Sequence, residues 1–529
     1  MTRDRRLRLA SGLLLVALLG VMLVTVLDYG MTADEPVQNR YGRRLVRWYA
    51  TLGADRAAVE QHDTFYYGGL FELAAQAARW VSPLGVYETR HVVNVLFGFV
   101  GLMAALLLGT QLGGPLAGLL SLLFLALTPA YYGHAFNNPK DIPFAALFSL
   151  GAAAILRVSA HLPRLQPRHV LGVGLLVGLA AGVRVAGLVL VPCAAALWLG
   201  VLWSKSGRRP STHDLARLGL VLLGVLVLAW GVMVALWPWA QLDPFRNPFR
   251  ALAVFSRFWT GMPVLFDGQL VPSGALPRTY IPTWFALTLP AFYLVAAAMG
   301  VGRLVTLRSE HLRGPAAATR LLAIAWLAAT TAAPVLWVVV NHTPFYNGHR
   351  HFLFIVPGLA VLAGTAAAAW LKDGRGLRTP LRAGGGAILG ICLSVTFVDM
   401  VRLHPYQSLY FNRVVAGGLK QAAEKYETDY WCSTYREGLD WVVDHYSRPE
   451  RAERVRVAGH ATLTQVSYDL RRTEERRRQF RPVTIHDDPH LILATTAAGD
   501  HRRTPGRVVH VVERLGTPLL FIFEVEEPR

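Results

Sequence analysis

Two adjacent carboxylates, Asp34 and Glu35, follow the first long apolar stretch of the chain and precede a proline. A carboxylate held just above a membrane surface could take a proton from an incoming hydroxyl or amide, as a general base does. Adjacent residues do not share a helix face, so we expect different roles for the two acids, and either could be the base. The same pattern is also typical of a helix start, with an acidic cap and Pro36 at the first helical position.

A second polar group lies in the segment TPAYYGHAFNNPKDIP, between two apolar stretches. Its candidates for a binding site are His134, Asn137, Asn138, Lys140 and Asp141. Polar residues so close to a membrane span are costly and indicate function, although a solvated turn rich in Asn and Pro is the alternative. Lys140 could meet a phosphate, and Asp141 could orient it.

Further cations interrupt apolar sequence. Arg184 lies within GLLVGLAAGVRVAGLVLV, where it is either functional or extends to the lipid headgroups. The segment NHTPFYNGHRHFLFIVP contributes five candidates: His342, Tyr346, His349, Arg350 and His351. An arginine offers a planar fork of donors that suits phosphate. The segment HPYQSLYFN adds His404 and Tyr406, where a belt of aromatic residues at the membrane interface is the alternative.

The elements that must position these residues are membrane helices. Stretches of about 20 apolar residues predict about eleven spans. They cover residues 9–28, 91–110, 115–133, 142–158, 169–183, 186–203, 215–237, 282–301, 320–340, 352–371 and 383–401. The N-terminal stretch is too long for a typical signal peptide and lacks a cleavage site, which favours an uncleaved first helix.

The orientation follows from the charges of the connections. Five Arg-rich segments fall on alternate turns: MTRDRRLR, RVSAHLPRLQPRH, SKSGRRPSTHDLAR, GRLVTLRSEHLRG and KDGRGLR. Because Lys and Arg stay cytoplasmic in short loops, we expect the N-terminus inside. All the candidate groups above then face outward, with loops 30–90 and 238–281 and everything after residue 402. The predicted location is a bacterial-type inner or plasma membrane, with the C-terminal domain periplasmic or extracellular.

Composition supports this class. The chain has 529 residues, 53% of them hydrophobic and 16% charged, with a net charge of +19. Cytoplasmic loops explain much of that charge, so nucleic-acid binding is not expected. The three cysteines predict no disulfide framework, and no Cys/His spacing suggests a metal. We therefore predict a mainly α, polytopic domain over 1–401 and a small α/β domain over 402–529, with strand-like runs VRVAGHA, LILATTA, RVVHVVERL and PLLFIFEV.

The chain resembles the GT-C membrane glycosyltransferases, in particular the dolichyl-phosphate-mannose–protein mannosyltransferase-like and aminoarabinose transferase-like branch. The similar blocks are LDYGMTADEP, HAFNNPKDIPFA, LPRTYIPTW, FYNGHRHFLFIVP and RLHPYQSLYFNRVVAGG, within residues 20–440. The resemblance implies transfer of a sugar from a polyprenyl-phosphate donor to a lipid, glycan or protein acceptor, without a cofactor. Inversion at the anomeric carbon is expected because such a transfer is a single displacement.

The resemblance also implies residue roles. It gives Asp34 as the base, with Glu35 beside it. The chemistry of the residues themselves adds that Lys140, Arg184 and Arg350, with Arg278 or His349 as further candidates, would stabilise the leaving phosphate as charge builds on it. Two other classes stay open: a transporter or lipid flippase, which would keep charged sites near the bilayer midplane, and an assembly scaffold that uses the tail. A scaffold should tolerate the change Asp34→Asn.

Overall fold

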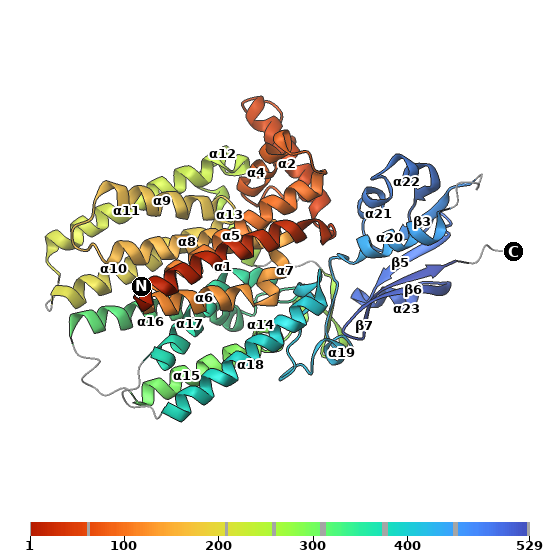
Figure 1. Ribbon diagram of the computed structural model, residues 1–529. Coiled ribbons are helices and arrows are strands. Elements are labelled where there is room, and N and C mark those ends of the chain that lie inside the picture. Colours follow the sequence, from red (N-terminus) through yellow and green to blue (C-terminus); the bar gives the residue numbers. More distant parts are fainter. Residues whose placement is uncertain are drawn as a thin grey trace.

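The computed structural model describes residues 2–60, 64–206, 210–256, 261–306, 314–372, 379–447 and 453–525. A bundle of helices forms the larger part of the molecule, and a small sheet with its own helices lies at one end of that bundle (Figure 1). The N-terminus lies toward the opposite end of the bundle (Figure 1). Parts of three Arg-rich connections, at 207–209, 307–313 and 373–378, fall outside the described residues.

Within the described residues, eight helical segments are long and apolar enough to cross a membrane. They comprise α1 (Arg3–Thr25, continued by η1, Val26–Asp28), α5 (Val86–Gly113), α8 (Asp141–Ser159), α10 (Leu190–Ser206, preceded by η2, Val185–Val189), α11 (Thr212–Ala235), α16 (Pro315–Asn341), α17 (Val356–Lys372, preceded by η5, Arg350–Ile355) and α18 (Thr379–Leu403). The outer helices expose large apolar side chains such as Val16, Val24 and Leu220. The chain is therefore an integral membrane protein, with lipid as the solvent of these faces.

The predicted count of about eleven unbroken spans is not confirmed. Two predicted spans are bent pairs: α6 (Pro115–Ala126) with α7 (Pro129–Asn137) at 65°, and α14 (Tyr280–Thr288) with α15 (Ala291–Thr306) at 98°. Pro129 and Pro290 lie at the two bends, where proline removes a helical hydrogen bond and clashes with the preceding turn. The predicted span 169–183 is the shorter apolar helix α9 (Pro167–Ala181).

The two predicted outward loops are largely ordered. The first contains α2 (Glu35–Ala50), α3 (Ala57–Glu60) and α4 (Leu70–Val81). Helices α2 and α4 pack together, with apolar residues on one face of each. The second loop contains α12 (Pro238–Leu242), α13 (Asn247–Ser256) and an antiparallel hairpin of β1 (Pro263–Phe266) and β2 (Gln269–Pro272), which the sequence did not predict.

The C-terminal region has a five-stranded sheet in the order β4-β3-β5-β7-β6. Its strands are β3 (Val455–Gly459), β4 (Phe480–Pro482), β5 (Leu491–Thr495), β6 (Arg507–Arg514) and β7 (Thr517–Glu524). Strands β4, β3 and β5 are parallel, and β7 joins β5 and β6 in antiparallel pairs. The four predicted strands are confirmed. Helices α20 (Tyr435–Tyr446), α21 (Leu463–Leu470) and α22 (Glu474–Gln479) accompany the sheet (Figure 1).

Candidate active site

Several helix starts meet at the end of the bundle that faces the sheet. Asp34 lies at the N-cap position of α2 without a side-chain capping hydrogen bond, Asp141 is the first residue of α8, and Arg350 is the first residue of η5. Arg184 lies directly before η2. These starts bring four of the predicted residues together from positions far apart in the sequence.

The two adjacent acids have different surroundings. The Glu35 side chain is buried and accepts hydrogen bonds from the Thr32 backbone N–H at 2.8 Å and the Thr32 hydroxyl at 3.2 Å. His91 Nε2 lies 3.2 Å from the same Glu35 oxygen. The Asp34 side chain is 36% exposed, and its Oδ2 lies 3.5 Å from Arg350 Nη1. Glu35 is thus held inside the fold, whereas Asp34 is open to an incoming molecule.

Asp141 links the cations of the site. Its carboxylate accepts a hydrogen bond from Arg184 and another from the Asn138 amide at 2.9 Å, and it lies 3.7 Å from Arg350 Nη1. We call Asp34, Lys140, Asp141, Arg184 and Arg350 the charged cluster. It contains three cations and two carboxylates, so one positive charge remains to be balanced. A partly enclosed site with surplus positive charge favours an anionic ligand.

Aromatic rings that the sequence analysis missed support the cations. Tyr67 lies beneath Lys140 Nζ, at 4.5 Å from the ring centre, and beneath the Arg184 guanidinium at 5.5 Å. Trp431 lies 4.7 Å from the Arg350 guanidinium. Aromatic faces attract cations and hold them in place without neutralising their charge. The aromatic runs FYYGG and YWC were the available signal, but neither is specific for a site.

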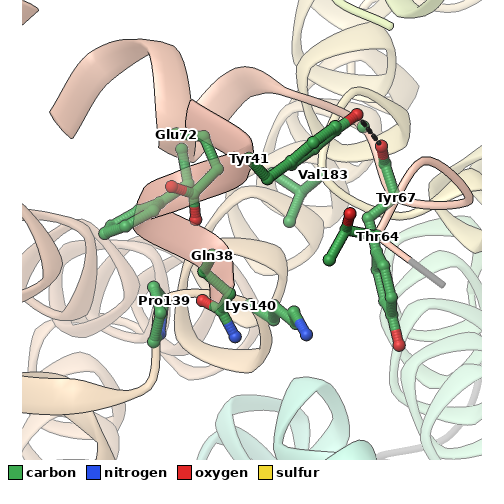
Figure 2. A pocket seen from close by; sticks show the side chains of 10 residues that line it. Gln38, Tyr41, Thr64, Tyr67, Glu72, Pro139, Lys140 and Val183 are labelled. Atoms are coloured by element: carbon green, nitrogen blue, oxygen red, sulfur yellow. Dashed lines mark hydrogen bonds between the residues drawn. The ribbon is translucent and has the colours of Figure 1, made fainter. Parts of the chain in front are cut away.

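Lys140 has no carboxylate within ion-pair distance in the described part of the chain. Burial lowers the pKa of its ammonium group, and the charge of Asp34 opposes that shift. Figure 2 shows Lys140 at a cavity with Gln38, Thr64 and Tyr67. The cavity is narrow, with about 20 Å³ of space for the centre of a water molecule. A lysine in such a place can meet a phosphate oxygen from the cavity side.

The remaining candidates of the central segments lie beside the cluster and are mostly buried. Asn138 orders Asp141 through its amide oxygen, which accepts from the Asp141 backbone N–H at 3.0 Å. Asn137 donates to the Gly30 carbonyl at 3.1 Å. The His134 ring contacts Trp431 edge-on at 5.3 Å. Tyr346 lies 5.5 Å from the Arg350 guanidinium. These side chains support the charged residues rather than adding charge.

His349 is buried, and burial lowers its pKa to about 4. Its ring is therefore neutral at physiological pH and cannot supply a positive charge to a phosphate. It lies near Thr288 and Phe285. His351 packs against the rings of Phe345 and Tyr346.

Four predicted residues lie away from the cluster. His404 pairs with Asp28 at 2.8 Å, and the Tyr406 hydroxyl donates to Glu437 at 2.8 Å. His342 Nε2 lies 2.7 Å from the Leu276 carbonyl oxygen. Arg278 is exposed before α14 and forms no ion pair with the cluster among the residues described.

No group of three or more His, Cys, Asp or Glu side chains able to hold a metal ion occurs within the described ranges. Cys193, Cys392 and Cys432 are free thiols.

Comparison with solved structures identifies the fold. The crystal structure of ArnT from Cupriavidus metallidurans in the apo state has a TM-score of 0.50 with this chain at 14% identity, covering 96% of this chain and 97% of that chain. The structure of ArnT from the same organism bound to undecaprenyl phosphate gives 0.49 at 14% identity over the same shares. Archaeal oligosaccharyltransferase AglB from Archaeoglobus fulgidus, in complex with an inhibitory peptide and a dolichol-phosphate, gives 0.45 at 10% identity, covering 91% and 69%.

No protein-family profile and no curated protein matches the sequence. The likeness to apo ArnT shows the fold that the resemblance to GT-C membrane glycosyltransferases implied. The prediction of a mainly α, polytopic protein with a small C-terminal sheet is confirmed.

Proposed function

We propose that the protein is an integral-membrane glycosyltransferase that moves a sugar from a polyprenyl-phosphate donor to an acceptor at the outer face of the membrane. One observation carries the proposal. A partly exposed carboxylate, Asp34, lies 3.5 Å from a buried arginine in a cluster with surplus positive charge. A base beside an anion-binding group is the arrangement that glycosyl transfer from a phosphate requires. The fold shared with ArnT is consistent with it.

In the proposed reaction, Asp34 takes the proton of the acceptor nucleophile as that atom attacks the anomeric carbon. The bond between the anomeric carbon and the phosphate oxygen breaks, and its electron pair stays on the phosphate. Lys140, Arg184 and Arg350 stabilise the charge that builds on this leaving group. Because one displacement occurs, the configuration at the anomeric carbon inverts.

The position of the cluster argues against the alternative of a transporter or flippase. Its residues come from the starts of α2, α8, η2 and η5, and Trp431 of the C-terminal region lies 4.7 Å from the Arg350 guanidinium. A transporter site is expected near the bilayer midplane, between repeated halves. ArnT, whose apo form shares the fold, has also been solved with undecaprenyl phosphate, and we propose a donor of that lipid class here.

The reaction is tested by incubating the purified protein with undecaprenyl phosphate linked to different sugars, in the presence of membrane lipid extract. We expect release of undecaprenyl phosphate for at least one sugar, and loss of that release in Asp34→Asn. Glu35→Gln serves as the matched carboxamide change at the adjacent acid. Movement of labelled donor across vesicles without cleavage would support the flippase class instead.

The orientation is tested with single cysteines. Glu474 lies on α22, where its side chain is 74% exposed, and Asp4 is exposed at the start of α1. Cys432 is half-buried and burial raises the pKa of its thiol, so the native cysteine is a poor reporter. In intact cells, we expect a membrane-impermeant thiol reagent to label Glu474→Cys above the unmodified protein but not Asp4→Cys. The reverse pattern would contradict the outward orientation of the cluster.

A further inference from the structure

A broad groove lies at the boundary between the helical bundle and the C-terminal region. Its wall consists of Arg79 in the last turn of α4, residues 85–88 at the start of α5, and residues in and directly after α21, among them Arg471 and Arg472. The groove has about 650 Å³ of space for the centre of a water molecule, compared with about 20 Å³ for the cavity at Lys140. A space of this size can hold a small molecule or a lipid headgroup.

The groove carries an excess of positive charge. The residues that line it include three arginines and one carboxylate, Glu88. Arg472 is already paired, with Glu88 and, at 3.4 Å, with Asp469. Arg79 and Arg471 form no ion pair with a carboxylate within the ranges that the structure describes. Two cations therefore line the groove without a counter-charge, which favours an anionic ligand.

These two cations approach the groove from its opposite sides, Arg79 from the bundle and Arg471 from the C-terminal region. Nη1 of Arg79 donates to the carbonyl oxygens of Ser82 at 3.1 Å and Leu84 at 2.9 Å. Such neutral acceptors hold the side chain in place but leave its charge unbalanced. A guanidinium presents a planar fork of donors that matches the oxygens of a phosphate. The chemistry of the groove thus favours a phosphate group.

The surroundings indicate that this phosphate belongs to a lipid. Helix α5, whose first residues form part of the groove wall, is long and apolar enough to cross a membrane, so the groove lies where a span begins. Trp80 and Val81 directly follow Arg79 and are 76% and 86% exposed. Tryptophan is enriched at the level of the lipid headgroups, and exposed apolar side chains there are covered by lipid.

We propose that this groove binds the phosphate-bearing headgroup of a membrane lipid, with Arg79 and Arg471 as the contacts to the phosphate. Trp80 and Val81 then lie against the apolar part of the same lipid. None of the residues that line the groove belongs to the charged cluster, and the inference goes beyond the proposed function because it involves no sugar and no transfer step. Free inorganic phosphate is the other source of the same chemistry, and the experiment separates the two.

The test measures binding to the purified full-length protein in detergent by titration calorimetry. The probes are dihexanoyl phosphatidic acid, dihexanoyl phosphatidylcholine and inorganic phosphate. We expect phosphatidic acid to bind most tightly, because phosphatidylcholine has no net charge and inorganic phosphate has no apolar chains. Its affinity should fall by about 3- to 10-fold in Arg79→Gln and in Arg471→Gln, and by about 10- to 100-fold in the double variant. Trp80→Ala should weaken phosphatidic acid but not inorganic phosphate.

Two further variants serve as controls. Arg477→Gln changes an exposed arginine of α22 that does not line the groove, and it should leave all affinities unchanged. Arg350→Ala removes a cation of the charged cluster and should leave binding at the groove intact. Because Arg471 is exposed, Arg471→Gln keeps the test valid even if Arg79→Gln disturbs the loop that Arg79 holds.

Several results would overturn the inference. Equal affinities for phosphatidic acid and phosphatidylcholine would do so, as would unchanged affinities in Arg79→Gln and Arg471→Gln. A loss in Arg477→Gln as large as that in Arg471→Gln would show unspecific attraction to positive charge. A loss in Arg350→Ala without one in Arg471→Gln would place the lipid at the charged cluster. Inorganic phosphate that binds as tightly as phosphatidic acid would exclude a lipid as the ligand. All these results are independent of whether the protein transfers a sugar.

Discussion

Two groups of charged residues lie where the helical bundle meets the C-terminal region, and they differ in how their charges are paired. The second group, which we call the domain joint, consists of Glu88, Tyr468, Arg472, Tyr406, Glu437 and Arg514. There, Glu88 accepts from Tyr468 at 2.6 Å and from Arg472, and Glu437 accepts from Tyr406 at 2.8 Å and from Arg514 at 2.6 Å.

In the domain joint each arginine has a carboxylate partner, and Arg472 has a second one in Asp469 at 3.4 Å, whereas the charged cluster has two carboxylates and three cations. Arginines that each have a carboxylate partner leave no cation free for a ligand, and the contacts of Glu88 with Tyr468 and Arg472 join the helical bundle to the C-terminal region. An unbalanced group is costly in the free protein and becomes favourable when an anion binds. Residue type alone therefore does not distinguish a structural charge from a functional one. The number of oppositely charged partners of each side chain does.

The largest expected effect concerns Asp34, the open acid of the charged cluster. We expect Asp34→Asn to lower turnover by about 10²–10⁴-fold, because asparagine keeps the size of the side chain but cannot take a proton. The loss should appear in kcat rather than in donor binding, since only the base function is removed. Steady-state kinetics with the best sugar-bearing lipid measures it.

Glu35→Gln is the control for this change. Its carboxylate accepts from Thr32 and faces His91 within the fold, so we expect lower thermal stability and only a secondary effect on turnover. A variant pair with the opposite behaviour, in which Glu35→Gln loses turnover and Asp34→Asn does not, would move the base to Glu35. Full activity in both variants would remove the carboxylates from the mechanism.

The second effect concerns Glu427, a buried residue that lines a cavity together with Arg350 and whose Oε2 has no hydrogen-bond partner among the described residues. Its pKa rises from 4.5 to about 7 on burial, so the folded protein holds an extra proton between these values. The protonated Glu427 carboxyl makes its full contribution to the free energy of unfolding below pH 4.5. This contribution is lost as the pH rises through 7. We expect Glu427→Gln to stabilise the protein by up to about 3 kcal/mol at pH 8, with the gain fading toward pH 4.5.

Thermal unfolding in detergent between pH 5 and pH 8 measures this gain. Glu437→Gln in the domain joint should have the opposite sign, because its carboxylate is paired with Arg514 and Tyr406. If both variants destabilise the protein equally at pH 8, the contrast between open and paired charges is wrong for Glu427.

The third effect concerns the cations. We expect Lys140→Ala and Arg350→Ala each to weaken the use of donor by about 10- to 150-fold, which corresponds to about 1.5–3 kcal/mol for a lost hydrogen bond to a charged group. Arg514→Ala is the matched control, since it removes a cation from the domain joint. It should lower stability and leave the donor KM unchanged. Unchanged donor KM and kcat in Lys140→Ala and Arg350→Ala would remove both residues from the site.

Much of the fold could be predicted from local patterns. Each stretch of about 20 apolar residues that predicted a span contains a helical segment in the structure. Runs of β-branched and aromatic residues correctly predicted four strands of the sheet. The bends at Pro129 and Pro290 were not predicted, because a proline can end, kink or start a helix depending on its neighbours. Strand β4 was not predicted, because it is only three residues long and its partner β3 is distant in the sequence.

The site was harder to predict, for a different reason. Asp34, Lys140, Asp141, Arg184 and Arg350 stood out because charge is costly near a membrane, and the structure brings them together. His404 and Tyr406 stood out for the same reason yet belong to or border the domain joint. Local sequence cannot show that Glu35 faces His91 or that Trp431 lies under Arg350, because those contacts join distant segments.

The smallest expected effect tests the joint itself. Tyr468→Phe removes the hydroxyl that donates to Glu88 at 2.6 Å and keeps the ring that contacts Tyr87 edge-on at 4.7 Å. We expect a loss of about 1 kcal/mol in stability, typical of one hydrogen bond, with unchanged donor KM and kcat. Tyr446→Phe is the matched control, because its hydroxyl donates to Glu524 at 3.0 Å within the C-terminal region. Both variants should lower the unfolding temperature slightly, but only Tyr468→Phe should increase hydrogen exchange in α21, which carries Tyr468 across the boundary. A change in donor KM with Tyr468→Phe would show that the joint also takes part in donor binding, and the division between paired and open charges would then fail.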